Sequence, residues 1–193
     1  MNHKAGPLWL LAILIFSSLA CEITIGGNQN DVSGSGDVIQ ESRQVSGVHS
    51  VQVSNQGNLF IEIGNEEKLV VEAHENLIQY ISSDVQNGQL ILETVPFVNL
   101  KSSKPINYYL IVKSLDEIEV TSSGDVQAPA LLADDFHIRV SSSGDVSIAD
   151  LVVDQLEVNI TSSGDVAIKG GQVGTQDIKI SSSGNYSAEN LES

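Results

Sequence analysis

Apolar and polar residues alternate through most of the chain between Val51 and Leu191. A period of two is typical of β-strands that bury one face. The segment "ENLIQYI" at 75–81 has helical spacing but is too short to make a convincing helix. We therefore predict an all-β fold. The clearest alternating stretches are "LFIEI" at 59–63, "LVVEA" at 69–73, "LILET" at 90–94 and "YYLIV" at 108–112.

A second, longer period of twenty residues begins at residue 118. When the chain from residue 118 is written in rows of twenty, residues twenty apart fall into columns. Five of these columns are apolar in nearly every row, and they start at residues 118, 120, 126, 128 and 131. Between the columns a polar hexamer returns in register, reading TSSGDV at 121–126, SSSGDV at 141–146, TSSGDV at 161–166 and SSSGNY at 181–186. A weaker copy, "VQVSNQGNL" at 51–59, aligns with "IEVTSSGDV" at 118–126.

A fixed short period of this kind indicates a solenoid, in which each repeat stacks on its neighbours. Coils stacked at the strand spacing of about 4.8 Å would place each apolar column in a continuous core. Parallel crossovers are almost always right-handed. We therefore predict an all-β, right-handed parallel β-helix or β-roll-like solenoid with coils of about 20 residues.

The repeated hexamer is expected to be the corner of each coil. Its glycine can adopt the positive φ that a corner needs, and the Asp or Asn that follows can bond the backbone of its own turn. The predicted turn-forming residues are Gly124, Gly144, Gly164 and Gly184, followed by Asp125, Asp145, Asp165 and Asn185.

The N-terminal segment reads as a lipoprotein signal peptide over residues 1–20. Lys4 precedes an apolar run too short to span a bilayer, and small residues lead to Cys21. Ser18–Cys21 resembles a lipobox, although Ser18 stands where a larger aliphatic residue is usual. We expect Cys21 to be lipidated. An ordinary signal peptide and an uncut membrane anchor are the alternatives.

The rest of the chain divides by composition into a tether and one domain. Residues 21–42, rich in Gly, Asn and Ser, are expected to be flexible. Residues 43–193 form the predicted β-solenoid domain, with irregular coils over 43–117 and regular 20-residue coils over 118–191. The segment "VPFVNLKSSKP" at 95–105 is expected to be a loop excursion from this domain.

The charge balance excludes one class of partner. The formal net charge is −16, and removal of Lys4 with the signal leaves eight basic against 25 acidic residues, or −17. Such an acidic surface repels phosphate backbones, so we expect no nucleic-acid partner. The expected contacts are the membrane through the N-terminal lipid, a surface glycan or protein ligand, and another copy of the chain.

The sequence resembles a known bacterial group, the head GIN domain family of putative auto-transporter adhesins, a domain of unknown function. The resemblance lies in "RQVSGVHSVQVSNQGNLFIEIG" at 43–64, "LVVEAHENLIQYISSDVQNGQLIL" at 69–92 and the "SSGDV" coils at 121–186. It implies a β-helix-like solenoid on a secreted or lipid-anchored protein. It carries over no catalytic residue.

Candidate chemistry is sparse. His3, His49, His74 and His137 show no metal spacing, and we expect the last three to be solvated. The column of Asp125, Asp145 and Asp165 is a candidate calcium ladder, but water-exposed turn caps explain it more simply. No catalytic residue and no cofactor is expected.

Two function classes remain. The first is a non-enzymatic, lipid-anchored protein of the bacterial cell envelope, facing outward or the periplasm, that acts as an adhesin or surface scaffold. The alternative is a carbohydrate-active β-helix enzyme resembling a polysaccharide lyase, or a calcium-binding solenoid. A lyase needs a base beside the acidic column, where the nearest basic residues are Arg139, Lys169 and Lys179.

The last coil raises a separate question. Ile180, Tyr186 and Leu191 still occupy core columns there, so its apolar surface and strand edges need a cover. We expect this solenoid end either to dock onto another copy or to be covered by the early segment 37–48.

Overall fold

The computed structural model describes residues 30–192 of the 193-residue chain, and the predicted signal peptide, Cys21 and His3 lie outside them. The described residues form sixteen strands and a single short 3₁₀ turn, η1 (Ile78–Tyr80), which confirms the all-β prediction. No helix in this part of the chain has the length and apolarity needed to cross a bilayer.

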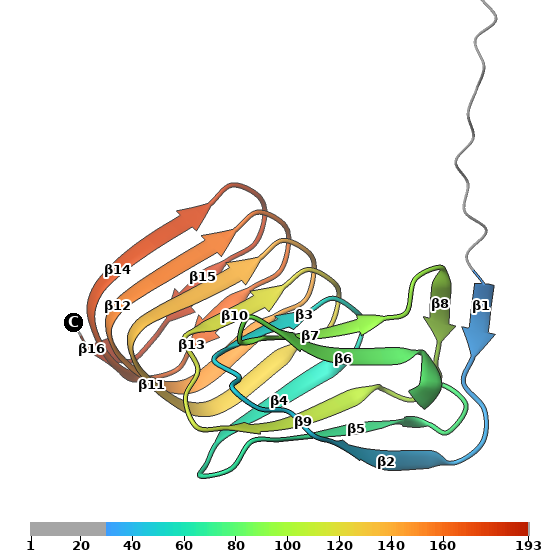
Figure 1. Ribbon diagram of the computed structural model, residues 1–193. Coiled ribbons are helices and arrows are strands. Elements are labelled where there is room, and N and C mark those ends of the chain that lie inside the picture. The colour runs from blue at the N-terminus through green and yellow to red at the C-terminus, as the bar shows by residue number, and fades with distance from the viewer. Residues whose placement is uncertain (1–29, 193) are drawn as a thin grey trace, which may run out of the picture.

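The C-terminal part of the chain winds through stacked turns that pair in parallel (Figure 1). Each strand before the last coil pairs with a strand twenty residues further on, so that Val126 lies beside Val146, then Val166, then Tyr186. This confirms the predicted register. The strands are β10 (Glu117–Val120), β11 (Val126–Val140), β12 (Val146–Ile160), β13 (Val166–Ile168), β14 (Gly171–Ile180), β15 (Tyr186–Ala188) and β16 (Leu191–Glu192).

The apolar columns form the core of this stack. Ile118, Ile138 and Val158 of one column are fully buried. Burial weakens only in the last coil, where Ile180 is 43% exposed. Two strands of the first half begin the stack: β3 (Ser50–Val53) pairs with β10, and β4 (Asn58–Ile63) pairs with β11. Val51 thus lies beside Ile118 and Leu59 beside Val126, as the weaker sequence copy predicts.

The first half departs from the predicted parallel topology. Antiparallel pairs join β2 (Val38–Arg43) to β5 (Lys68–His74), β5 to β9 (Asn107–Val112), and β6 (Ile81–Gln86) to β7 (Gln89–Thr94). The main sheet is therefore mixed, and a parallel β-helix is the wrong description of residues 43–117. For β6 and β7 the physical reason is connection length, because antiparallel strands can be joined by a few residues whereas parallel strands need a long crossover.

The hairpin between β6 and β7 has a sequence signal that the repeat pattern does not take into account. Its two-residue loop is Asn87-Gly88, with φ values of 51° and 82°. Positive φ at both loop residues matches the right-handed twist of the flanking strands, and Asn-Gly is the usual pair at such a turn. The dipeptide therefore predicts an antiparallel hairpin where the repeat pattern suggested another coil.

Two segments expected to be irregular pair with each other. β1 (Asn30–Ser33), within the predicted tether, runs parallel to β8 (Val98–Lys101), within the predicted loop 95–105, and the two form a separate sheet. β2 also begins inside the predicted tether. Because β2 pairs with β5, the segment 37–48 lies at the opposite end of the molecule from β14 and β16 (Figure 1). The idea that it covers the last coil is wrong, and docking onto another copy stays a prediction.

The corner glycines are required for a reason other than the predicted one. Among the described glycines only Gly36, Gly47, Gly88 and Gly171 have positive φ, so none of the four corner glycines does. They are buried instead, and a Cβ on Gly144 would lie 2.2 Å from the carbonyl oxygen of Gly124. The corners stack so closely that backbone fills the place of a side chain.

Candidate functional site

The outer face of the sheet β2–β5–β9–β4 carries three ordered rows of side chains. Alternate residues of these strands, such as Leu59, Leu69 and Tyr108, are fully buried in the core. The residues between them point outward, and strand pairing places them side by side across the sheet. The rows are Glu62–Ile111–Lys68, then Phe60–Tyr109–Val70, then Asn58–Asn107–Glu72–Gln40.

The middle row is an aromatic platform. The rings of Phe60 and Tyr109 are stacked, with centroids 5.3 Å apart and planes inclined by 17°. Val70 lies on the other side of Tyr109. Together with Pro129 of β11 these side chains line a cleft of about 360 Å³. The platform is apolar, and Tyr109 remains 37% exposed.

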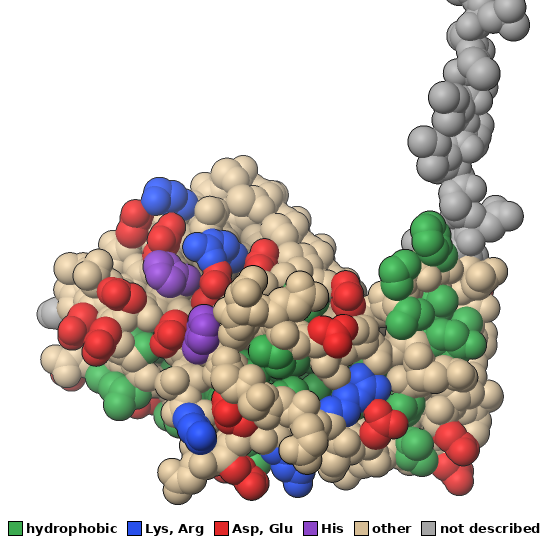
Figure 2. Space-filling view, in the orientation of Figure 1, with side chains coloured by type: hydrophobic (Ala, Val, Ile, Leu, Met, Phe, Trp, Pro, Cys, Tyr) green, Lys and Arg blue, Asp and Glu red, His purple; other side chains and the backbone are tan. Residues whose placement is uncertain are grey.

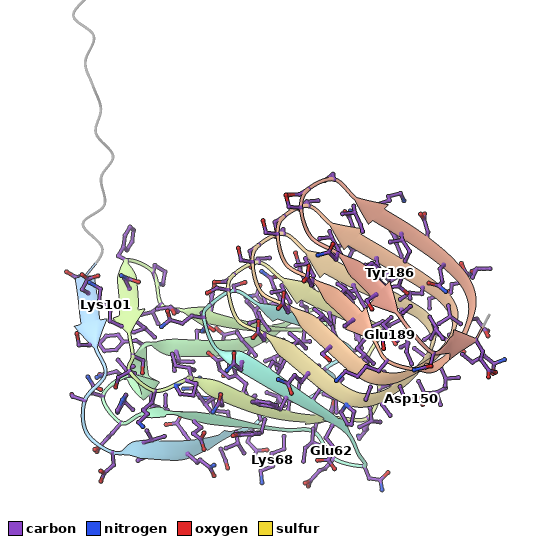
Figure 3. All side chains as sticks on the ribbon, turned by 180° about the vertical axis from the view of Figure 1, so that it is seen from behind. Glu62, Lys68, Lys101, Asp150, Tyr186 and Glu189 are labelled. Carbon is purple, nitrogen blue, oxygen red and sulfur yellow. The ribbon has the colours of Figure 1, made fainter. Side chains whose placement is uncertain are left out.

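The first row places opposite charges at one rim of this cleft. Glu62 and Lys68 flank Ile111 on either side, because both strands pair with β9 at that residue. Both side chains line the cleft, and Figure 3 shows them close together at this end of the sheet. The rim therefore offers a hydrogen-bond acceptor and a donor to a ligand on the platform.

The third row is a fixed polar network. Glu72 accepts hydrogen bonds from Gln40 Nε2 at 2.7 Å, from Asn107 Nδ2 at 2.8 Å and from the Tyr109 hydroxyl at 3.3 Å. The bonds from Gln40 and then Asn107 hold the pKa of Glu72 below its ordinary value. Burial, and then the charge of Glu72, raise the pKa of Tyr109. The network therefore keeps a carboxylate and several amide groups in set positions beside the rings.

A second cleft of about 310 Å³ continues from the first around Phe60. The two share Phe60, Ile61 and Pro129, and the second extends over β11 and β12 to Ser147 and Lys169. The candidate site is thus an extended surface rather than a closed pocket, with the Phe60 ring at its centre.

The acidic column is structural in a way that differs from the prediction. Each carboxylate caps the next coil rather than its own turn: Asp125 Oδ1 accepts the backbone N–H of Asp145 at 3.0 Å, and Asp145 Oδ1 accepts that of Asp165 at 2.8 Å. Asp165 does the same for Asn185. Within residues 30–192 no group of three or more His, Cys, Asp or Glu side chains is arranged to hold a metal ion.

The other predicted residues lie apart from one another. His74 is buried rather than solvated, and its Nδ1 donates to the Gly36 carbonyl at 3.0 Å. His137 Nδ1 lies 3.3 Å from Glu157 on the surface of the stack. Arg139 pairs with Glu117 and Lys179 with Asp177, so neither serves the acidic column.

The sequence reasoning missed the three rows altogether. Phe60 and Tyr109 stand at the outward positions of "LFIEI" and "YYLIV", where alternation predicts polar residues. An aromatic residue on the solvent-exposed face of a strand was the signal in the sequence that could have indicated the site. Which rows these residues join depends on β9 lying between β4 and β5, and local pattern does not report that pairing.

Comparison with known proteins identifies relatives by sequence family and by fold. The family model described as "Putative auto-transporter adhesin, head GIN domain" matches residues 48–193, which confirms the resemblance seen in the sequence. No curated protein matches the chain.

Solved structures share the fold at low identity. A putative adhesin from Bacteroides fragilis aligns with a TM-score of 0.55 and 16% identity, over 81% of this chain and 99% of that one. A putative adhesin from Parabacteroides distasonis aligns with a TM-score of 0.58 and 19% identity, over 84% and 77%. One from Parabacteroides merdae aligns with a TM-score of 0.57 and 14% identity, over 82% and 98%.

Proposed function

Because the chain belongs to the head GIN domain family of putative auto-transporter adhesins, we propose that it is a non-enzymatic, lipid-anchored protein of the bacterial cell envelope that binds a carbohydrate. The observation that carries the ligand class is the stacked pair Phe60–Tyr109 beside the Glu72 network. Sugar rings present C–H groups on their faces and hydroxyl groups around their edges. An aromatic surface bordered by fixed amide and carboxylate groups complements both.

The extent of the surface favours a chain of sugar units over a single one. The two clefts meet at Phe60 and together cross five strands (β5, β9, β4, β11 and β12), from Lys68 to Lys169. The lysines near both ends suit a glycan that carries carboxylate or sulfate groups. Because the protein has a net negative charge, such a ligand can bind only where basic side chains contact its anionic groups.

A binding role fits the site better than catalysis. A general acid needs a carboxyl group whose pKa is raised, so that it holds a proton near neutral pH. Hydrogen bonds hold the pKa of Glu72 below its ordinary value instead. Glu72 therefore acts as a constant acceptor that positions its neighbours and a ligand hydroxyl.

The architecture of the C-terminal part supports the same role. We propose that its stacked coils wind as a right-handed, β-helix-like solenoid, the hand that parallel crossovers almost always adopt. A rigid stack of this kind would hold the cleft in a fixed shape. Lipidation at Cys21 would keep it at the membrane surface, facing outward or the periplasm.

Glycan binding is testable with the lipidated chain in detergent against a panel of acidic polysaccharides. Tyr109→Ala is expected to weaken binding about ten-fold or more, because removing a central aromatic contact commonly costs above 1 kcal/mol. Tyr109→Phe retains stacking and should lose less. Leu132→Ala, at an exposed residue outside both clefts, is the matched control. Equal binding by all three variants, or turnover of the polysaccharide by the parent protein, would refute the proposal.

A further inference from the structure

The loop between β7 and β8 presents an exposed apolar tip. Its residues are Val95, Pro96, Phe97 and Val98, here called the β7–β8 tip. Pro96 and Phe97 are exposed, whereas Val95 and Val98 are half-buried. Phe97 is 70% exposed, and its φ of 65° lies in the left-handed region that residues with a Cβ rarely adopt. Such a conformation at a bulky residue persists only where neighbouring structure imposes it.

The tip lies where the described chain begins. The backbone N–H of Asn30 donates to the Phe97 carbonyl at 2.8 Å, and β1 then runs parallel to β8. Figure 2 shows hydrophobic side chains gathered at this end of the molecule. The nearest acidic side chain of β1, Asp31, is paired with Lys101 at 2.5 Å, which lowers its pKa and offsets its charge.

The distance from the tip to Cys21 is short. Eight residues, 22–29, separate Cys21 from Asn30. Even a fully extended chain of this length spans only about 30 Å. If Cys21 carries lipid, as the proposed function holds, the tip stays within that distance of the bilayer.

We propose that the β7–β8 tip inserts into the interfacial layer of the membrane that holds the lipid anchor. Aromatic side chains favour this layer, and the anchor would supply a high local concentration of lipid. A protein partner fits less well, since four residues fall far short of the roughly 800 Å² per partner of a standard interface. The contact would orient the domain by fixing a second point on the membrane.

Tryptophan fluorescence tests this directly, because the one tryptophan of the chain, Trp9, lies in the predicted signal peptide and is removed when Cys21 is lipidated. Phe97→Trp therefore gives the mature protein a single tryptophan, at the tip. Leu132→Trp is the matched control, since Leu132 is 71% exposed on β11, a strand that Figure 1 shows in the stacked part of the molecule, away from β1 and β8. Each lipidated protein is reconstituted in phosphatidylcholine vesicles with and without brominated acyl chains, and thermal unfolding confirms that each is folded.

The expected result is a blue-shifted emission and strong quenching by bromolipid for Phe97→Trp, with neither for Leu132→Trp. Equal quenching of the two reporters, or none in either, would overturn the tip proposal while leaving the anchor intact. The mass of the Cys21 peptide is measured in the same preparation. Absence of lipid mass would overturn the anchor, and with it the tip contact.

A second variant separates membrane contact from folding. Phe97→Gly relieves the left-handed φ and is expected to raise the unfolding temperature. A lower unfolding temperature would show that the ring packs for stability, which contradicts the proposal.

Discussion

The two halves of this protein are built from the same strands by different rules. In residues 117–192 each strand before the last coil has its partner twenty residues further on, and the same columns face the core. In residues 30–116 antiparallel pairs break that rule, and β9 lies between β4 and β5. Repetition makes a uniform stack whose surface changes little from coil to coil. Its interruption brings Phe60, Tyr109 and Glu72 together, and the candidate site lies there.

The stacked half also carries its own set of close contacts. Its corners repeat a buried glycine, a serine hydroxyl bonded to the coil before it, and an aspartate bonded to the coil after it. Adding a side chain at a corner glycine of the stack should therefore be costly, and adding one at a glycine of the first half with open space around it should be mild.

The largest expected effect is that of Gly144→Ala. The new Cβ would lie 2.2 Å from the Gly124 carbonyl oxygen, which is backbone and cannot move aside without opening the stack. We expect a loss of about 4 kcal/mol or more in unfolding free energy. Gly47→Ala is the control from the first half: a Cβ there meets nothing within 4 Å, and its φ of 68° alone should cost about 1–2 kcal/mol. Equal losses in urea titrations would refute the backbone explanation.

Next in size is Ile160→Ala in the fully buried column. Truncating an aliphatic core residue costs about 2–5 kcal/mol. Ile180→Ala is the same change twenty residues later, where the side chain is 43% exposed, and should cost under about 1 kcal/mol. Similar losses for both would mean that the last coil is covered in solution, for example by a second copy. Sedimentation of the parent protein would then decide.

The first half should show its own alkaline sensitivity through Tyr108. Burial raises the pKa of Tyr108 from 10.0 to about 12, partly offset by the bond from Asn55 Nδ2 to its hydroxyl. A raised folded-state pKa means that the stabilisation is complete below pH 10 and declines as pH rises through about 12. The difference between the folded and unfolded pKa values of Tyr108 corresponds to roughly 3 kcal/mol of unfolding free energy. Tyr108→Phe should flatten the stability curve over that range, and an unchanged slope would contradict the assignment.

The smallest expected effect is at the acidic caps. Asp165→Ala removes the acceptor for the backbone N–H of Asn185 and should cost about 1 kcal/mol. Asp165→Asn keeps an acceptor oxygen and should cost less. If the two variants lose the same stability, measured by thermal unfolding, the charge rather than the hydrogen bond is responsible. Added calcium is not expected to rescue either variant.

The sequence by itself determined the all-β fold, the twenty-residue register and the buried columns. These features are local and repeated. Val126, Val146 and Val166 each occupy the same buried position in successive coils, so each repeat gives the same prediction. Even the weaker copy at 51–59 was found in its true register, because it follows the same pattern.

The tertiary structure alone decided the rest. The corner glycines looked like positive-φ residues, and only the distance to the coil below showed that backbone excludes a Cβ. The antiparallel pairs made by β5, the β1–β8 sheet and the rows of the cleft join segments some 30 to 70 residues apart. Alternation shows which face of a strand is exposed to solvent but not which strand lies beside it, because strand pairing depends on contacts between residues that are distant in the sequence.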